Sequence, residues 1–457
     1  MNMRSRWFPY LILLIVSALA YLPFVGRFTY ANDDWYLMYG AHVQGSDYFA
    51  PAYERDRPMR AYVLGPAYDL FGDNPLPYHL SAYAFRLLSA VSLLWLLNQL
   101  WPCPSTMGSD KAEKRRPLDP PLRTANLLVA LLFLIYPGFL SQPNPIDYQS
   151  QIVSLFAAMT SLALTVAALK ADKTVAKVVY TILSILLAWV YLGLIEYYLG
   201  LEVLRLLAVY LVISRRGQGS FRSRLWPTLR AWMPFAIGPL VFLVWRLFLF
   251  TSGRNATDVG LQFGALFASP LQTGLWWLAR LVQDTLNVLF LAWGVPLYNL
   301  AFNLRLSDTW IGLGLAGAVA AAVVFAFWRM DKSTVSDETE GDWRAEMLWV
   351  GIISAMAGLV PVILVNRHVE FFSLSRYTLA SSAGAAMAIV AMLYYLSSTR
   401  LRWGLAGLLI GLAVLTHFAN SVNIAREADA LRNFWWQVSW RVPQMRPGTT
   451  LAAQFPA

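Results

Sequence analysis

The chain has 457 residues, of which 58% are hydrophobic and 14% are charged, whereas a soluble protein carries roughly 25% charged residues. This composition excludes an ordinary soluble protein and predicts an all-α polytopic membrane protein, because several apolar runs approach the roughly 20 residues that cross a bilayer. The net charge of +10 does not indicate nucleic-acid binding, because Lys and Arg gather in short loops between apolar runs, as in cytoplasmic loops of membrane proteins.

The first apolar run, residues 8–25, predicts an uncleaved transmembrane helix with a cytoplasmic N-terminus. Arg4 and Arg6 precede it, and it is longer than the apolar core of a typical signal peptide. Residues 26–77 then form a long first outer loop, in which residues 35–39 and 59–71 are predicted to lie as helices along the membrane surface.

Further apolar runs complete a single membrane domain over residues 1–457 with about eleven transmembrane helices. Basic loops between them are predicted to face the cytoplasm. The predicted crossings after the first lie at 78–101, 124–140, a fourth ending at 170, two short ones within 178–213, 232–250, 310–328, 347–365, 377–396 and 404–419.

Segment 275–304 is apolar, yet Arg280, Asp284 and Asn287 lie on one face of the predicted helix. Three polar groups on one face are costly against lipid. We therefore expect this helix to lie in a second large outer loop, 251–309. If it spans the membrane instead, every later loop changes sides. The tail, 420–457, is expected outside.

Asp33 and Asp34 directly follow the first apolar run, where the chain leaves the bilayer. One interpretation is helix capping, because acidic residues interact favourably with the free N–H groups and dipole at a helix N-terminus. The other is catalysis, because a carboxylate within hydrogen-bond reach of an acceptor hydroxyl acts as a general base. One Asp can cap while the other does the chemistry, and the sequence does not separate them.

Arginines supply candidate phosphate ligands. Residues 54–60 hold three arginines and two acids, which form either a solvated charged turn or a phosphate site containing Arg57 and Arg60, because guanidinium donors match phosphate oxygens. His368, Arg376 and Tyr377, at the ends of two later helices, either anchor the chain at the interface or complete this site.

Two acids, Glu196 and Glu202, lie deep in apolar sequence, where acidic residues are functional candidates. A tight turn near 193–200 would let Glu196 reach the outer side. The residues that we expect to line the outer cavity are Trp35, Asp56, Glu196, Arg280 and Asp284.

A single cysteine, Cys103, excludes an internal disulfide and a cysteine-based metal cluster. The four histidines lack metal-ligand spacing such as HExxH. Asp33 and Asp34 are adjacent but have no obvious third ligand, so we expect no metal and no cofactor, with a divalent metal as the open alternative.

Together, an acidic pair at the start of a long outer loop and about eleven helices resemble the GT-C glycosyltransferases. The similarity is greatest to the protein mannosyltransferase and lipid A aminoarabinose transferase group. Those enzymes have an Asp-Glu or similar acidic element, followed by a basic-Pro-Pro-Leu element. This chain has Asp33-Asp34-Trp35 and then Asp56-Arg57-Pro58-Met59. The second Asp in place of Glu and the single Pro are departures.

The resemblance implies a GT-C-like fold, Asp33 or Asp34 as catalytic base, and Arg57 near the donor phosphate. It also implies a polyprenyl-phosphate or polyprenyl-diphosphate sugar donor, inversion at the anomeric carbon, and transfer to a glycan, lipid or protein acceptor on the non-cytoplasmic face, which we expect to be that of a bacterial inner membrane. Some enzymes of this class need a divalent metal and others do not, and we expect metal-independent transfer here. Alternatives are a lipid or sugar transporter or flippase, and a glycan polymerase or ligase. A transporter predicts mid-membrane breaks and a repeat between halves, and the sequence shows no convincing repeat.

Overall fold

Every regular element in the described part of the computed structural model is helical. The structure describes residues 7–102, 120–216, 220–251, 253, 259–331, 343–442, 444–446 and 448–450. Most of the basic segment 102–123 and of the connection between the helices that end at 331 and begin at 343 lies outside this part. The fold class predicted from composition, an all-α polytopic membrane protein, is confirmed.

Nine helices are long and apolar enough to cross a membrane, in the described part of the chain. Two shorter apolar helices occupy the positions predicted for the first and third crossings. The bounds of these helices are α1 Phe8–Tyr21, α5 Pro75–Leu100, α6 Pro120–Leu134, α7 Gln149–Lys170, α8 Thr174–Leu194, α9 Leu201–Ser214, α10 Phe221–Val244, α14 Leu306–Asp331, α15 Trp343–Leu364, α16 Leu379–Tyr395 and α17 Thr399–Arg441.

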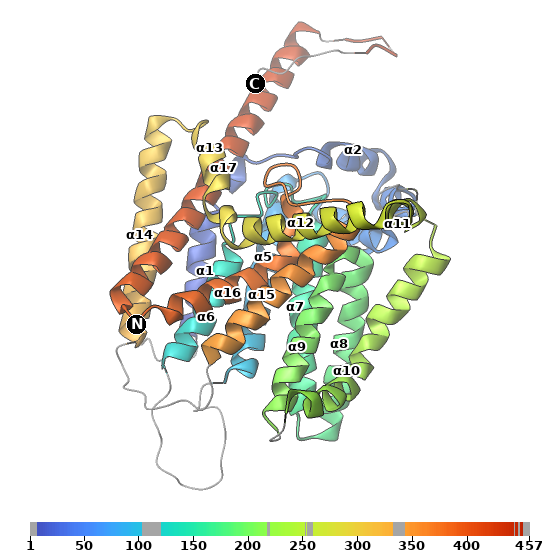
Figure 1. Cartoon of the computed structure of the whole chain (residues 1–457). Coiled ribbons are helices and arrows are strands. Elements are labelled where there is room, and N and C mark those ends of the chain that lie inside the picture. The colour runs from blue at the N-terminus through green and yellow to red at the C-terminus, as the bar shows by residue number, and fades with distance from the viewer. Residues whose placement is uncertain are drawn as a thin grey trace.

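Shorter helices lie at one end of this bundle, which we call the loop end (Figure 1). Helices α2 and α12 lie across the direction of α7, α8 and α9 there, and α12 is not among the long apolar helices. The bounds are η1 Val25–Arg27, α2 Asp34–Gln44, η2 Ser46–Tyr48, α3 Phe49–Tyr53, η3 Pro58–Arg60, α4 Ala61–Phe71, η5 Glu196–Gly200, η6 Trp245–Leu249, α11 Val259–Ala268, α12 Pro270–Leu289, η8 Leu291–Trp293, α13 Val295–Ala301 and η9 Ser375–Thr378.

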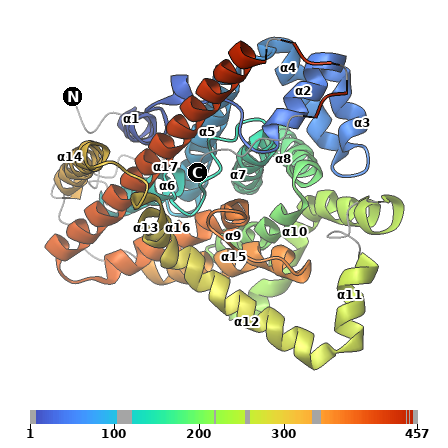
Figure 2. The same cartoon turned by 90° about the horizontal axis from the view of Figure 1, so that it is seen from above.

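The loop end has two separate groups of short helices. Seen from above, α2, α3 and α4 lie at one edge of the bundle, and α11 and α12 lie at the opposite edge (Figure 2). The connections from α7 to α8 and from α9 to α10 lie at the other end of the bundle (Figure 1). The helices expected along the surface at 35–39 and 59–71 correspond to α2 and α4.

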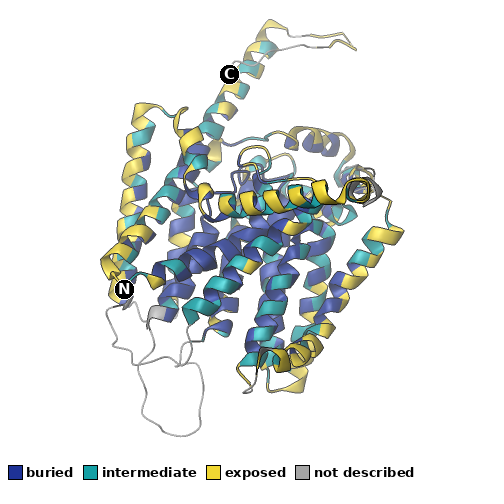
Figure 3. Ribbon diagram, in the orientation of Figure 1, coloured by how far each residue is buried: buried dark blue, intermediate teal, exposed yellow. Residues whose placement is uncertain are grey.

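Close helix packing in the centre rests on small side chains. A Cβ added at Gly351 of α15 would lie 2.5 Å from the backbone nitrogen of Ala388, and one added at Gly384 of α16 would lie 2.4 Å from that of Ala355. Small residues permit such contact between helices in membranes. Helix α16 is accordingly buried almost throughout, whereas α14 and α12 contain many exposed residues (Figure 3).

Three predicted helix ends are wrong. The first helix ends at Tyr21 rather than at 25, and the third ends at Leu134 rather than at 140. The last helix was expected to end at 419 but continues to Arg441, because polar side chains beyond the apolar part have partners. Asn420 donates to the carbonyl of Leu140 over 2.8 Å, and Arg426 pairs with Asp308.

Candidate active site at the loop end

The two adjacent aspartates have different environments. Asn32 adopts a left-handed conformation with φ 48°, which Asn tolerates better than most residues, and α2 begins at Asp34. The side chain of Asp34 is fully buried, whereas Asp33 is exposed. Asp33 occupies the N-cap position without a side-chain hydrogen bond to the helix. Helix capping was one of the two interpretations of the acidic pair, and the Asp33 side chain does not provide it.

Asp34 binds a segment far along the chain. Its Oδ1 accepts a hydrogen bond from the backbone N–H of Asp147 at 2.7 Å, and its Oδ2 accepts one from the N–H of Ala31 at 3.4 Å. Burial raises the pKa of Asp34 to about 7, and the negative charge of Asp147 adds to this rise, against the lowering effect of the N–H donors. Asp34 is therefore a carboxyl group that can exchange a proton near neutral pH.

Asp147, in the connection between α6 and α7, is the second carboxylate of the site. Its Oδ1 accepts a hydrogen bond from Arg60 Nη2 at 2.7 Å, and its backbone carbonyl also accepts from Arg60. Burial alone would raise the pKa of Asp147, but the charge and hydrogen bond of Arg60, with the charges of Arg376 and Arg57, hold it below its usual value. Its side chain is 18% exposed, so Asp147 presents an ionised carboxylate at the edge of the site.

Arg60 is held from three sides. Its Nε donates to Ser150 Oγ at 3.4 Å, and its guanidinium lies 4.4 Å from the centre of the Tyr53 ring. Only 5% of Arg60 is exposed. Arg60 thereby connects η3 and α3 of the first loop to the start of α7. Its positive charge is neutralised by the ion pair with Asp147.

Arg57 forms a bidentate ion pair with Glu196. Its Nε and Nη2 donate to the two carboxylate oxygens at 2.7 and 2.8 Å. The pair joins the first loop to η5, which follows α8, and Asp56 lies 3.7 Å from Arg57 Nη1. Glu196, expected to line the cavity, thus contacts the arginine expected to bind phosphate.

Arg376 has aromatic neighbours. Its Nη1 donates to Tyr148 Oη at 2.7 Å, and its guanidinium lies 5.0 Å from the centre of the Tyr377 ring. Tyr377 in turn packs edge-on against Tyr197, beside Glu196, with ring centres 5.3 Å apart. Within the described ranges Arg376 makes no ion pair, so its charge is available to a ligand.

A second cation without an ion pair in the described structure, Arg246, lies near Glu196. It sits in η6, a single π-helical turn at the end of α10, and such turns occur frequently at functional sites. Arg246 lies close enough to Glu196 to interact with its charge. Its guanidinium stacks over Phe250 at 4.6 Å, while Nη2 is buried without a hydrogen-bond partner in the described structure.

These contacts bring together one group of the predicted residues. We call this group, with the residues added by the structure, the carboxylate–arginine cluster. It contains Asp34, Asp56, Arg57, Arg60, Asp147, Tyr148, Glu196, Arg246, Arg376 and Tyr377. Its members come from the first loop, the α6–α7 connection, η5, η6 and η9.

Two other predicted residues, Asp284 of α12 and His368 between α15 and η9, have contacts of their own. Asp284 is fully buried and accepts hydrogen bonds from the N–H of Val369 at 3.0 Å and from Asn287 at 3.3 Å. Burial raises the pKa of Asp284. His368 pairs with Glu370 at 3.0 Å. Asp284 therefore fixes the connection between α15 and η9, and no contact links Asp284 or His368 directly to Asp34 in the described structure.

Arg280 and Trp35 also lie apart from the carboxylate–arginine cluster. Arg280 donates to Gln283 at 2.8 Å and packs over the ring of Trp276 at 5.3 Å. Trp35 lines an open cleft formed with α17.

Sequence reasoning missed Asp147, Tyr148 and Arg246. Asp147 and Tyr148 follow a Pro-rich turn between two apolar runs, and Arg246 interrupts another apolar run. Both features were visible in the sequence: an acidic residue in a short outer turn, and an arginine inside a predicted crossing, where charges are costly.

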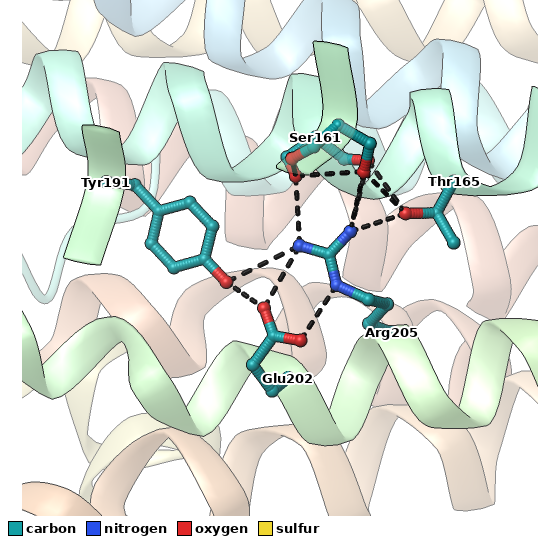
Figure 4. Close-up of polar contacts among 6 residues, drawn as sticks. Ser161, Thr165, Tyr191, Glu202 and Arg205 are labelled. Carbon is teal, nitrogen blue, oxygen red and sulfur yellow. Dashed lines mark hydrogen bonds and ion pairs between the residues drawn. The ribbon is translucent and has the colours of Figure 1, made fainter. Parts of the chain in front are cut away.

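A further polar group lies within the bundle, away from the cluster. Arg205 of α9 donates to both carboxylate oxygens of Glu202, at 2.8 and 3.0 Å, and to Ser161 and Ser184, each at 2.9 Å. Figure 4 shows this arrangement, in which Tyr191 also donates to Glu202. The paired charges join α7, α8 and α9 to one another, which explains the acidic residue at position 202 by packing.

Metal-ligand geometry is not found in the described residues, where no group of three or more His, Cys, Asp or Glu side chains could hold a metal ion.

No family model matches the chain. No curated protein matches it either. Among solved structures, the chain is similar to an oligosaccharyltransferase from Archaeoglobus fulgidus, solved in complex with zinc and sulfate, with 14% identity and a TM-score of 0.43. The overlap covers 91% of this chain and 53% of the archaeal one, so the chain spans about half the length of that protein. A similarity this distant assigns neither a function nor a site.

Proposed function

We propose that the protein is an integral membrane glycosyltransferase of the GT-C type, which transfers a sugar from a polyprenyl-phosphate donor to an acceptor on the non-cytoplasmic face. The observation that carries this proposal is the carboxylate–arginine cluster: two neighbouring carboxylates and two cations without ion pairs, gathered at one end of a membrane bundle. Acceptor activation needs the carboxylates, and the departing phosphate needs the cations.

In the proposed reaction, the acceptor hydroxyl oxygen attacks the anomeric carbon of the donor sugar. Its proton passes to the carboxylate pair, while the bond from the anomeric carbon to the phosphate oxygen breaks and its electrons remain on the polyprenyl phosphate. Direct displacement of this kind inverts the anomeric carbon. Contact with the acceptor is assigned to Asp147, which is partly exposed, whereas Asp34, the stronger base of the two, is buried. Because the charges of Asp34 and Asp147 interact, the proton taken from the acceptor is assigned to the two carboxylates jointly and not to one of them.

The phosphate is assigned to Arg376, with Arg246 as a second cation near Glu196. The sequence suggested Arg57, Arg60 and Arg376 for this role, but Arg57 and Arg60 are each paired with a carboxylate. We therefore propose that Arg57 and Arg60 position Glu196 and Asp147. A cation without an ion pair gains most from a phosphate whose negative charge increases as the sugar departs.

The distribution of basic residues supports a non-cytoplasmic loop end. The α7–α8 and α9–α10 connections, at the opposite end (Figure 1), contain Lys173, Arg215 and Arg216. Positively charged loops generally stay in the cytoplasm. We propose this orientation, with a cytoplasmic N-terminus, in a bacterial inner membrane as the resemblance to GT-C enzymes implies.

The reaction class is tested with purified protein in proteoliposomes that contain undecaprenyl phosphate carrying radiolabelled glucose, mannose or aminoarabinose, and an extract of membrane glycans as acceptor. We expect one of these donors to be converted to free undecaprenyl phosphate while label enters a product, also in the presence of EDTA. Movement of a donor between leaflets without its consumption would overturn the proposal in favour of a transporter. Transfer of whole glycan chains would favour a ligase.

A further inference from the structure

An open cleft is formed by residues of the first loop and of α17. These α17 residues belong to the part of the helix that extends beyond the bundle (Figure 1). Its volume is about 470 Å³, which is within the range of roughly 300–1,000 Å³ that is usual for small-molecule sites. The cleft is lined by Thr29, Trp35, Leu431, Arg432 and Trp435. The two tryptophans keep 42% and 47% of their surface exposed, so both offer aromatic surface to a ligand.

Neighbouring aromatic rings hold both tryptophans. Tyr30 packs edge-on against Trp35, with ring centres 5.2 Å apart and planes at 85°. Phe434 packs in the same way against Trp435, at 5.3 Å and 82°. A surface that is already held in place loses little conformational freedom when a ligand binds.

One ion pair joins the first loop to α17 near the cleft. Arg27 of η1 pairs with Asp429 of α17, and Arg432 pairs with the same carboxylate. Asp429 therefore fixes the distance between the first loop and α17 at one side of the cleft. The guanidinium of Arg432 has five N–H donors, more than its contact with Asp429 uses.

We propose that this cleft binds a sugar ring of a glycan acceptor, other than the ring that reacts. A pyranose ring presents a face of C–H groups. An aromatic ring attracts this face, because the π system places partial negative charge on the face of the aromatic ring. Its hydroxyl groups need hydrogen-bond donors at the edge, which Arg432 supplies. Two aromatic surfaces and one multidentate donor suit such a ring.

The position of the cleft argues against a lipid chain as its occupant. Helix α17 has 43 residues and is therefore about 65 Å long, at 1.5 Å per residue. The hydrocarbon layer is only about 30 Å thick. Trp435 lies close to the far end of α17, well beyond the apolar segment of that helix, where an aqueous or interfacial ligand is expected.

The relation between Trp35 and Asp34 indicates why the bound ring is not the reacting one. The two residues are consecutive, so their Cα atoms lie about 3.8 Å apart. However, Asp34 is buried and Trp35 is exposed, so their side chains project to different sides of α2. Because Asp34 does not line the cleft, a ring held there is not the ring that reacts, and the acceptor is then a glycan of at least two units. This step rests on the proposed function.

Sugar binding can be measured without any transfer reaction, by saturation-transfer difference NMR on the full chain in nanodiscs, which avoid sugar-headed detergents. The probes are the methyl α-glycosides of glucose, mannose and galactose. We expect saturation of the ring protons of at least one probe. Trp35→Ala or Trp435→Ala should weaken its binding by about tenfold, on the order of one lost aromatic contact.

Trp436→Ala is the matched control, because Trp436 is an exposed neighbour that does not line the cleft. Trp435→Phe should restore part of the binding. The proposal is overturned if no probe binds, if Trp435→Ala binds as the wild type does, or if farnesyl phosphate displaces the sugar from the cleft. Sugar binding by a protein that transfers nothing would disprove the proposed function alone.

Discussion

Asp33 and Asp34 show how far two identical neighbouring residues can differ in the folded protein. Asp34 is buried because its carboxylate binds the backbone of Asp147, which is 113 positions away in the sequence. Asp33 has no such partner among the described residues and remains exposed. Sequence reasoning identified the pair as a candidate base but could not choose between them, because the choice depends on this long-range contact.

The protonation of Asp34 should affect stability in a defined direction. Burial raises its pKa from an ordinary value of 3.8 to about 7, so the folded state binds this proton more tightly than the unfolded state. The resulting stabilisation is full below about pH 3.8 and is lost as pH rises through about 7.

Asn at position 34 cannot titrate. The melting temperature of Asp34→Asn relative to the wild type should therefore rise between about pH 5 and about pH 8. Thermal unfolding followed by differential scanning fluorimetry across this range measures the effect. Asp33→Asn, at the exposed neighbour, is the matched control. A constant difference between Asp34→Asn and the wild type would disprove the raised pKa.

Arg376 should contribute more to donor binding than other arginines of the same connection. Hydrogen bonds to charged groups are worth about 1.5–3 kcal/mol, so Arg376→Ala should weaken binding of undecaprenyl phosphate by roughly 10–100-fold. Arg376→Lys should recover only part of this loss, because Lys keeps the charge but not the planar set of donors.

Binding is measured by native mass spectrometry with undecaprenyl phosphate alone. Arg367→Ala is the control, since Arg367 is exposed on the same connection. Equal affinities for Arg376→Ala and Arg367→Ala would remove Arg376 from the phosphate site.

At the scale of elements, hydropathy located nearly all of the helices but not all of their ends. Apolar runs predict where a chain can enter lipid, and the long apolar helices lie where they were expected. Helix α17 extends further because, after position 419, it is held by polar contacts with the α6–α7 connection and with α14. A hydropathy pattern contains no information about such contacts.

The pair of Glu202 and Arg205 should act as a structural unit within α7, α8 and α9. Removal of one partner leaves a buried charge, which costs on the order of 3–5 kcal/mol, whereas replacement of both partners costs much less. Glu202→Leu and Arg205→Leu should therefore each lower the melting temperature strongly. The double variant should recover much of the loss.

The measurement is a double-mutant cycle of melting temperatures in one detergent, with transfer activity assayed below the transition. If the two single losses simply added in the double variant, the ion pair would have no role in packing. Loss of transfer in a folded double variant would instead make the pair functional.

At the scale of the whole molecule, the candidate site forms only when segments that are distant in the sequence pack together. The first loop supplies Asp34, Arg57 and Arg60, but their partners come from the α6–α7 connection and from η5. The sequence indicated that outer connections carry the chemistry, and it suggested Arg376 as the distant contributor. Asp147 was visible as an acidic residue in a short outer turn, but its contact with Asp34 could not be predicted, because the partner of a buried carboxylate depends on how α5, α6 and α7 pack.

The same packing explains why some predicted residues lie apart from the carboxylate–arginine cluster. Helix α12 lies at the opposite edge of the bundle from α2 (Figure 2). Asp284 and His368 therefore form contacts with the α15–η9 connection, although their residue types suit a catalytic site. One-dimensional spacing places residues on a face of one helix, but it does not determine which helix faces another.

The most direct test of the account compares single-turnover transfer by Asp34→Asn, Asp147→Asn and Asp33→Asn in proteoliposomes with the donor that the wild type consumes. General-base catalysis typically contributes about 10²–10⁴-fold, so Asp34→Asn and Asp147→Asn should each lose at least about 100-fold while still binding undecaprenyl phosphate. Asp33→Asn should retain wild-type activity. Full activity in both Asp34→Asn and Asp147→Asn, or loss of activity only in Asp33→Asn, would contradict the account.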